Sequence, residues 1–190
     1  LPPVTLQDIQ ATTRALLRSG APIQSINVIR KHLSMVKGGR LGGLTKAQGI
    51  VLVISDVIGD DLETIGSAPF YGDRSTYNDA HDILLRYQVW NRIPASVRSS
   101  IRSGLSGLIE ETPPAPRKNI DHVIVGSNRD LLYKIKARIE SLGVPAHIMS
   151  SQLKGEAREA ARALVAIGKE IIATGNPFKR PVCLLFGGET

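Results

Sequence analysis

An apolar run of strand length, Val51–Ile54, constrains the fold of this chain more than any other feature, because it stops abruptly. The residues that follow it are polar or turn-forming: Ser55, Asp56, Gly59, Asp60 and Asp61. A run bounded in this way is typical of a buried parallel strand, here over residues 50–55. Ligands of open α/β sheets bind just beyond the carboxyl ends of such strands. The three aspartates are therefore candidate ligands for a hard cation such as Mg²⁺, which prefers oxygen.

A basic cluster precedes this strand. Its members are Arg30, Lys31, His32, Lys37, Gly38, Gly39 and Arg40. Cations and acids placed close together in sequence suggest chemistry on a metal-bound phosphate. A structural interpretation is equally open, in which the acidic residues form only a turn and helix cap and the basic cluster is only a solvated face. The residues alone do not decide between the two interpretations.

Composition narrows the class of protein. In 190 residues, 42% hydrophobic and 22% charged residues are typical of a globular protein with a sizeable core. Aromatic content of 4% argues against a base-stacking nucleic-acid surface. A net charge of +7 suits anionic substrates. The sequence has no dense run of Lys and Arg that would mark a nucleic-acid-binding surface. We expect no nucleic-acid partner and, because neither a membrane-spanning segment nor a signal peptide is visible, no membrane partner.

The single cysteine, Cys183, lies inside the apolar run Val182–Phe186. We expect it to be a buried core thiol, and one cysteine allows no intramolecular disulfide. This pattern suits a reducing compartment, so we expect a cytoplasmic location.

Hydrophobic periodicity predicts helices over the first half of the chain. The expected helices are 5–19 with Thr5 as N-cap and Gly20 as C-cap, 24–36 with Gln24 or Ser25 near its start, a short one near 60–66, 75–87 capped by Ser75, and 94–107 opened by Pro94. The polar, Pro-rich segment 111–118 is typical of a stiff connector. We therefore expect one domain portion over 1–110 and another over 119–190.

After the connector, strands and helices alternate. Strands are expected at 121–126, 145–149 and 181–186, with one helix ending at Gly143 and another over about 153–174. A β-α-β-α-β series implies a parallel sheet with right-handed crossovers. The fold class predicted for the chain is therefore α/β, with parallel sheet layers flanked by helices in a Rossmann-like arrangement.

Two turns of this region are candidate anion sites. Gly126, Ser127 and Asn128 lie between a strand and a helix, where backbone amides can hold an anion. The alternative is that Ser127 or Asn128 merely caps the helix. Gly187, Gly188 and Glu189 form a second turn that a phosphate could approach closely. Neither the dinucleotide G-x-G-x-x-G pattern nor the Walker pattern is present.

Taken together, these strings resemble one family. The segments that carry the resemblance are Ile26-Asn27-Val28-Ile29-Arg30-Lys31-His32-Leu33-Ser34, Lys37-Gly38-Gly39-Arg40-Leu41, Ser55-Asp56-Val57-Ile58-Gly59-Asp60-Asp61, Gly126-Ser127-Asn128-Arg129-Asp130, Glu156-Ala157-Arg158-Glu159 and Gly187-Gly188-Glu189-Thr190. In this order they are similar to motifs of the glycerate 2-kinases that carry a MOFRL domain, some of which bear the older name hydroxypyruvate reductase. The resemblance covers nearly the whole chain.

The resemblance implies ATP-dependent phosphorylation of D-glycerate to 2-phosphoglycerate with Mg²⁺ or another divalent cation, by a two-domain α/β enzyme. The implied catalytic residues are Arg30, Lys31, Lys37, Asp56, Asp60 and Asp61, and the three aspartates double as metal ligands. The implied substrate- or nucleotide-binding residues are Asn27, Gly38, Gly39, Arg40, Ser55, Gly126, Ser127, Asn128, Gly187, Gly188 and Glu189. Partners would be D-glycerate and ATP, with a possible homo-oligomer.

The chain departs from the family pattern in two respects. Family members have further Gly-rich segments on both sides, so we expect this chain to be the middle portion of the enzyme, 119–190 leading into the MOFRL region, and to be inactive alone. Ser67-Ala68-Pro69-Phe70 stands where members commonly have Ser-Gly-Pro-Thr. Two alternatives are an NAD(P)H-dependent hydroxypyruvate reductase, which the missing dinucleotide pattern argues against, and a non-catalytic sub-domain.

Overall fold

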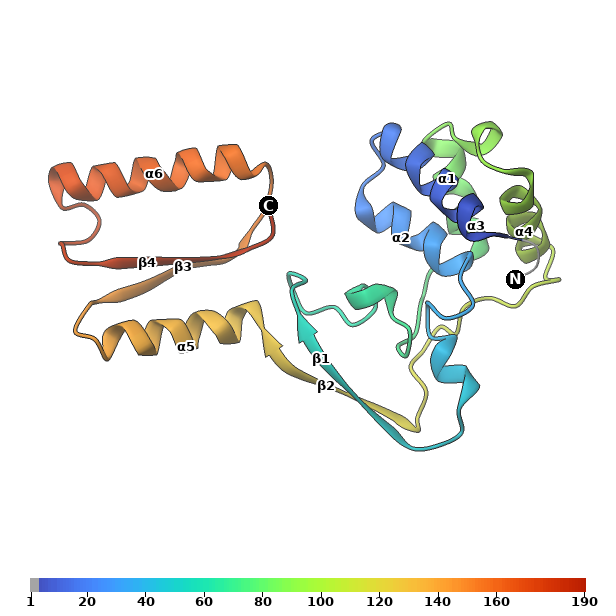
Figure 1. Ribbon diagram of the computed structural model, residues 1–190, viewed down its shortest axis with the longest axis horizontal. Coiled ribbons are helices and arrows are strands. Elements are labelled where there is room, and N and C mark those ends of the chain that lie inside the picture. The colour runs from blue at the N-terminus through green and yellow to red at the C-terminus, as the bar shows by residue number, and fades with distance from the viewer. Residues whose placement is uncertain (1–3) are drawn as a thin grey trace. The chain divides into compact units, whose positions relative to one another are not determined.

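A computed structural model describes residues 4–190 (Figure 1), so the first three residues of the predicted portion 1–110 lie outside the described residues. The chain divides into two compact units. Unit 1 takes in the chain up to Val51 together with Leu62–His122, and unit 2 takes in Leu52–Asp61 together with Val123–Thr190. The chain passes from one unit to the other after Val51 and again after His122. Both points lie inside strands, so each of these two strands belongs partly to unit 1 and partly to unit 2.

Unit 1 is built on the helices α1 (Leu6–Arg18), α2 (Ile23–His32), α3 (Tyr77–Arg86) and α4 (Ala95–Leu105). Helix α2 packs against α1 and α3, and α4 packs against the same two helices. The side chains of Leu16, Ile29, Leu84 and Ile101, among others, meet in one buried cluster between them. The short 3₁₀ helices η1 (Leu41–Leu44), η2 (Ile65–Ser67) and η3 (Trp90–Arg92) lie in the connections.

Side-chain caps fix where α1 and α3 begin. Thr5 and Asp8 form the capping box of α1, as the sequence predicts for Thr5. Thr76 and Asp79 form the same box on α3, so the predicted cap Ser75 is wrong by one residue. These reciprocal bonds satisfy backbone N–H groups that would otherwise have no partner in the first turn.

Helix α2 is shorter than the predicted helix 24–36. It begins at Ile23 after Pro22, with no side-chain cap, and it ends at His32. The helix stops there because the Ser34 hydroxyl accepts the backbone N–H groups of Val36 and Lys37, which draws residues 34–37 into a turn.

The short helix predicted near 60–66 does not form. Gly59 and Asp60 have φ angles of 91° and 56°, so the chain turns there in the left-handed region, and the first helical residue is Ile65. Asp60 and Asp61 therefore do not open a helix, and the interpretation of this pair as helix caps is wrong.

The Pro-rich segment 111–118 lies within unit 1. The backbone N–H of Asp73 donates to the Pro113 carbonyl at 2.8 Å, and the side chain of Thr112 is buried at 2% exposure. The position of a Cβ on Gly72 would be only 2.6 Å from the Ala115 backbone. The segment is thus packed along the loop before α3, and the change of unit comes later, between His122 and Val123. The assignment of 1–110 and 119–190 to parts of a kinase stays a prediction.

Unit 2 contains the α/β series that the sequence predicts. Its elements are the greater part of β1 (Gly49–Ser55) and β2 (Ile120–Ser127), then α5 (Asn128–Glu140), β3 (Ala146–Leu153), α6 (Ala157–Thr174) and β4 (Cys183–Gly188). Strands β1 and β2 form one two-stranded sheet, and β3 and β4 form another. Strands β3 and β4 run parallel, from the pair Ala146 and Cys183 to the pair Leu153 and Gly188.

The predicted fold class, parallel strands flanked by helices, is confirmed. Helix α5 packs against β3 and β4, and Figure 1 shows α5 and α6 on either side of this strand pair. Strand β3 runs four residues beyond its predicted end, so α6 begins at Ala157 rather than near 153.

Cys183 is not a buried core thiol. It is the first residue of β4 and is partly exposed. Within the described residues β4 pairs with β3 alone, so its other edge leaves the first residues of the strand accessible. Among the helices of residues 4–190, none combines the length and apolarity that crossing a membrane requires.

Candidate active site

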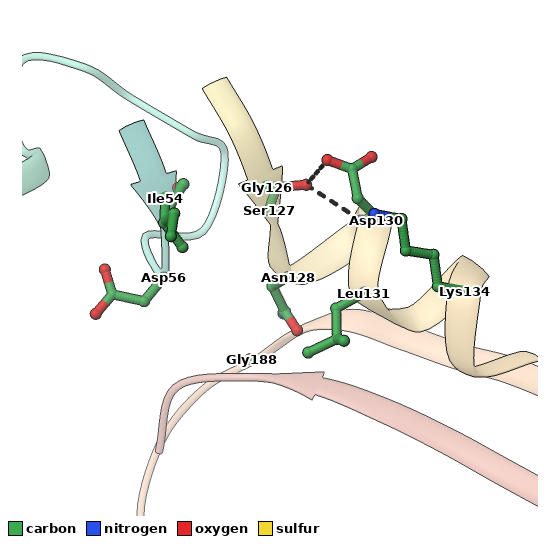
Figure 2. A pocket seen from close by; sticks show the side chains of 10 residues that line it. Ile54, Asp56, Gly126, Ser127, Asn128, Asp130, Leu131, Lys134 and Gly188 are labelled. Atoms are coloured by element: carbon green, nitrogen blue, oxygen red, sulfur yellow. Dashed lines mark hydrogen bonds between the residues drawn. The ribbon is translucent and has the colours of Figure 1, made fainter. Parts of the chain in front are cut away.

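Three strands of unit 2 end at one pocket of about 380 Å³ (Figure 2). Six predicted site residues line it: Ser55, Asp56, Gly126, Ser127, Asn128 and Gly188. The other lining residues are Ile54, Asp130, Leu131 and Lys134. Residues from β1, β2 and β4, which are far apart in the sequence, are therefore brought together at the carboxyl ends of their strands. This is where α/β folds bind ligands.

The start of α5 forms one wall of the pocket, and Ser127 caps it. The Ser127 hydroxyl accepts the backbone N–H of Asp130 at 3.1 Å and donates to the Asp130 carboxylate at 2.7 Å. The side-chain amide of Asn128 donates to the Ser151 carbonyl at 3.1 Å. Both polar side chains are thus engaged within the protein. What the wall offers an anion is the positive end of the helix and, one turn further on, Lys134.

Two glycines at the end of β4 allow a close approach of chain segments. A Cβ on Gly187 would overlap the side-chain amide of Asn128, and a Cβ on Gly188 would overlap the backbone of Leu153. The backbone N–H of the exposed residue Glu189 donates to the Leu153 carbonyl at 3.0 Å. Glycine is required here because the strand end packs directly against its neighbours.

The acidic loop after β1 spreads its carboxylates. Asp56 lines the pocket, whereas Asp60 and Asp61 do not. In Figure 2 the Asp56 carboxylate points away from α5. Across residues 4–190, no three His, Cys, Asp or Glu side chains gather as a cage for a metal ion. Mg²⁺ is commonly held by one or two carboxylates together with substrate phosphates. A single carboxylate, such as that of Asp56, would therefore be sufficient as the protein ligand.

The second predicted cluster lies in unit 1, in a turn over residues 34–40 that we call the basic turn. The backbone N–H groups of Gly38 and Gly39 donate to the carbonyls of Ser67 and Ala68 at 3.0 and 2.6 Å. Gly38 and Gly39 have φ angles of 59° and 78°, which glycine adopts without strain. The basic turn is therefore fastened to the loop that contains η2.

Two cations of this region have no acidic partner. Lys37 donates to the Gly66 carbonyl at 3.3 Å, and neither Lys37 nor Arg30 forms an ion pair with any residue of 4–190. Burial, and then the nearby charge of Arg30, hold the pKa of Lys37 below its usual range. Two positive charges that repel one another without a compensating carboxylate are suited to binding an anion.

Lys31 has a different environment. Its side chain is buried, and its ammonium lies 2.6 Å from the Asp73 carboxylate, which is also buried. Asp73 further accepts hydrogen bonds from the Ser75 hydroxyl at 2.6 Å and from Thr112 at 3.0 Å. Burial alone would raise the pKa of Asp73, but the hydrogen bonds of Lys31 and Ser75 and the charge of Lys31 outweigh it, so this pKa is lowered.

The remaining predicted residues of unit 1 are Arg40, which contacts the fully buried Tyr77, and Asn27. The Arg40 guanidinium donates to the Tyr77 hydroxyl at 3.4 Å and to the Glu110 carbonyl at 3.1 Å. Burial raises the pKa of the Tyr77 phenol. The Asn27 side-chain oxygen is buried and has no hydrogen-bond partner within the described part of the chain. Both of these hydrogen bonds of the Arg40 guanidinium are therefore made within unit 1.

The polar or charged residues of these sites that were not predicted include Asp73, Thr112, Asp130 and Lys134. Asp130 carried a signal, because Ser127-x-x-Asp130 is a capping pattern, and Lys134 follows one helical turn later on the same face. Asp73 and Thr112 carried no such signal in the sequence, because their hydrogen bonds join segments that are far apart along the chain.

Comparison with known proteins first defines the class. The model of the family described as a domain of unknown function (DUF4147) matches residues 1–102. The chain therefore belongs to this family.

Particular relatives are then informative. The chain is 45% identical over 187 residues to the glycerate 2-kinase of Pyrococcus horikoshii and 39% identical over 188 residues to the D-glycerate 2-kinase of Thermotoga maritima. Each alignment covers 98% of this chain, but only 42% and 43% of the relatives. The chain thus spans less than half the length of these relatives. The predicted resemblance to glycerate 2-kinases is confirmed.

Solved structures agree with this relationship. The crystal structure of a glycerate kinase from Thermotoga maritima matches with a TM-score of 0.81 at 39% identity, and that of a Pyrococcus horikoshii protein matches with a TM-score of 0.77 at 44% identity. Both matches cover the whole of this chain and 44% and 43% of the other chains.

Proposed function

We propose that the natural full-length protein phosphorylates D-glycerate to 2-phosphoglycerate, with ATP as the donor. The observation that supports this most is the pocket at the ends of β1, β2 and β4, which is lined by six residues of the resembling motifs. The names of the two relatives, glycerate 2-kinase and D-glycerate 2-kinase, point to the same reaction.

In this proposal the two units supply different parts of the chemistry. Phosphoryl transfer depends mainly on positioning and on stabilising the charge of the transferred group. The strand-end pocket of unit 2, with the start of α5 and Lys134, would hold phosphate groups of the nucleotide. Arg30 and Lys37 of unit 1 would bind a carboxylate or a phosphate group, because neither forms an ion pair within residues 4–190.

A divalent cation belongs to the same proposal. Asp56 is the aspartate of the acidic loop that lines the pocket, so it would be the protein ligand of Mg²⁺. When bound, the cation would neutralise charge on the phosphates. A cytoplasmic location, a MOFRL region and a homo-oligomer stay predictions.

The direct test supplies the full-length protein with ATP, Mg²⁺ and D-glycerate, and identifies the product by its separation from 3-phosphoglycerate. We expect 2-phosphoglycerate to form in proportion to the enzyme. Oxidation of NADH or NADPH with hydroxypyruvate, in the absence of kinase activity, would replace this proposal by the reductase alternative. Activity in neither assay would favour a non-catalytic role.

Asp56 provides the sharper test within the chain. Asp56→Asn should lower kcat/KM by about 100-fold, equivalent to ~2.7 kcal/mol, because the neutral amide neither binds the cation nor balances its charge. Asp121→Asn, an exposed carboxylate on β2 that does not line this pocket, is the matched control and should leave kcat/KM within about 2-fold. Equal effects of the two substitutions would remove Asp56 from the site.

A further inference from the structure

Lys31 and Asp73 form an ion pair in which both side chains are almost wholly buried, at 6% and 0% exposure. The Lys31 side chain therefore has little surface open to a ligand from solvent. Asp73 accepts at both carboxylate oxygens: Oδ1 accepts from Lys31 and Ser75, and Oδ2 accepts from Thr112. A buried charge pair is retained at low cost only when its remaining hydrogen-bonding groups are satisfied in this way.

This ion pair lies directly against the basic turn. The position of a Cβ on Gly38 is 2.8 Å from the Thr112 methyl group, 3.2 Å from the Asp73 Oδ2 atom and 3.4 Å from the Lys31 Cβ atom. Gly38 is thus enclosed by the three residues of the network, and Lys37 precedes it in the chain. A shift of Asp73 or Thr112 toward Gly38 would therefore press on the backbone that carries Lys37.

The other side of the basic turn is equally constrained. Gly66, Ser67 and Ala68 have φ angles of 61°, 62° and 52°, so three successive residues are left-handed. Such a conformation costs non-glycine residues free energy and persists only where the surroundings impose it. Here the amides of Gly38 and Gly39 bind the carbonyls of Ser67 and Ala68, and the Lys37 ammonium binds the Gly66 carbonyl. The basic turn is held between this strained segment and the buried pair.

We propose that Lys31 and Asp73 form a buried positioning pair, supported by Thr112, which fixes the basic turn so that Lys37 and Arg30, rather than Lys31, meet the anionic ligand. Lys31 is then a positioning residue, although the sequence motif suggested a catalytic one. The identity of the anion, a carboxylate or a phosphate group, rests on the proposed function, whereas the positioning role does not.

The first test compares single and double substitutions by urea unfolding of the full-length protein. Lys31→Met and Asp73→Asn each leave one buried charge without its partner, and each should raise the equilibrium constant for unfolding by about 100-fold or more. The double variant Lys31→Met/Asp73→Asn contains neither charge and should be more stable than either single variant. If the double variant loses as much stability as the two single variants together, the two charges do not stabilise one another and the proposal is overturned. If neither single variant folds, recovery of folded protein in the double variant gives the same answer.

The second test uses kinetics. The double variant should keep kcat/KM within about 10-fold of the wild type, because the side-chain amide that replaces the Asp73 carboxylate can still bond Ser75 and Thr112. Lys37→Met, by contrast, should lose about 100-fold. A double variant that is as inactive as Lys37→Met, but in which Lys37 titrates as it does in the wild type, would show that Lys31 meets the substrate and would overturn the proposal.

The third test needs no kinase activity, so it separates this inference from the proposed function. The Lys37 amine is titrated by NMR in the wild type and in Thr112→Val, which removes one hydrogen bond to Asp73 but keeps the side-chain shape. We expect the Lys37 titration to move toward that of an ordinary lysine in Thr112→Val, since the loosened turn exposes the amine. An unchanged titration would overturn the coupling, whether or not the protein phosphorylates glycerate.

Discussion

The two units present their candidate residues in opposite ways. In unit 1, helices enclose a contiguous core, and the candidate residue Lys37 lies on a turn that packs against a buried ion pair. In unit 2, the buried apolar side chains of the described residues are Val53, Leu132, Ala146 and Ile171. Its pocket is formed by strand ends, a helix cap and glycines. The candidate residues of unit 1 are positioned by buried side chains, whereas those of unit 2 are positioned by the backbone at the strand ends.

Both units expose large apolar side chains, in unit 1 for example Leu6 and Leu17 of α1. On β1, Leu52 and Ile54 are 67% and 80% exposed, and on β2 the side chain of Val125 is 51% exposed. Contiguous exposed apolar surface of this kind marks a site of contact with another segment or partner. Unit 2 therefore has strand surface that other parts of a protein could cover.

The largest expected effect tests this contrast in packing. Leu84→Ala, at a fully buried position of α3, should lower the free energy of unfolding by about 3 kcal/mol through lost burial and the cavity left behind. Leu131→Ala, at a position of α5 that is 56% exposed, should cost less than about 1 kcal/mol. Urea denaturation measures both. Similar losses would mean that unit 2 is as tightly packed as unit 1.

The next effect concerns the glycine beneath the basic turn. Gly38→Ala should cost about 2–3 kcal/mol, because it adds an overlap with Thr112 and Asp73 to the penalty of a left-handed backbone. Gly20→Ala is the matched control. Gly20 has a φ angle of 76° with nothing within 4 Å of its Cβ position, so the cost should be only about 1 kcal/mol. Equal costs would show that Gly38 is not enclosed.

A smaller effect is expected from acid. The pKa of Asp73 is lower in the folded protein than its ordinary value of 3.8, so its ionised form stabilises the native state above that pH. This contribution is lost as the pH falls below 3.8 and through the folded pKa. The free energy of unfolding should therefore decline more steeply in this acid range in the wild type than in Lys31→Met/Asp73→Asn. Parallel pH profiles would contradict the role of Asp73.

The smallest effect is a gain in stability. Ala68 has a φ angle of 52°, at the position where the resembling family commonly has glycine. Ala68→Gly should stabilise the native state by about 0.5 kcal/mol, since relief of left-handed strain exceeds the added entropy of the unfolded chain. Ala47→Gly, in an exposed segment without a positive φ angle, should instead destabilise slightly. A loss of stability in Ala68→Gly would show that packing of the Ala68 methyl group stabilises the protein by more than the left-handed backbone strain costs.

Local sequence determined much of this protein. Alternation of apolar runs with helical periodicity predicted the strands and helices of unit 2, because such patterns record which face of each element is buried. Polar and glycine residues at the strand ends predicted Ser55, Asp56, Gly126, Ser127, Asn128 and Gly188, which the fold brings to one pocket. Ligands of α/β folds bind at the carboxyl ends of strands, so local signals were enough to select these residues, although β1 and β2 form one sheet and β4 belongs to another.

Only the tertiary structure shows which members of the basic cluster have an acidic partner. Arg30, Lys31 and Lys37 look alike in sequence, yet Lys31 is paired with Asp73, which lies 42 residues further along the chain, while Lys37 has no acidic partner among the described residues. Ser67 and Ala68 are left-handed because the amides of Gly38 and Gly39 bind them, not because their own side chains favour it. Periodicity encodes burial and caps encode local hydrogen bonds, but whether a cation meets a carboxylate or a ligand depends on which distant segments pack against it.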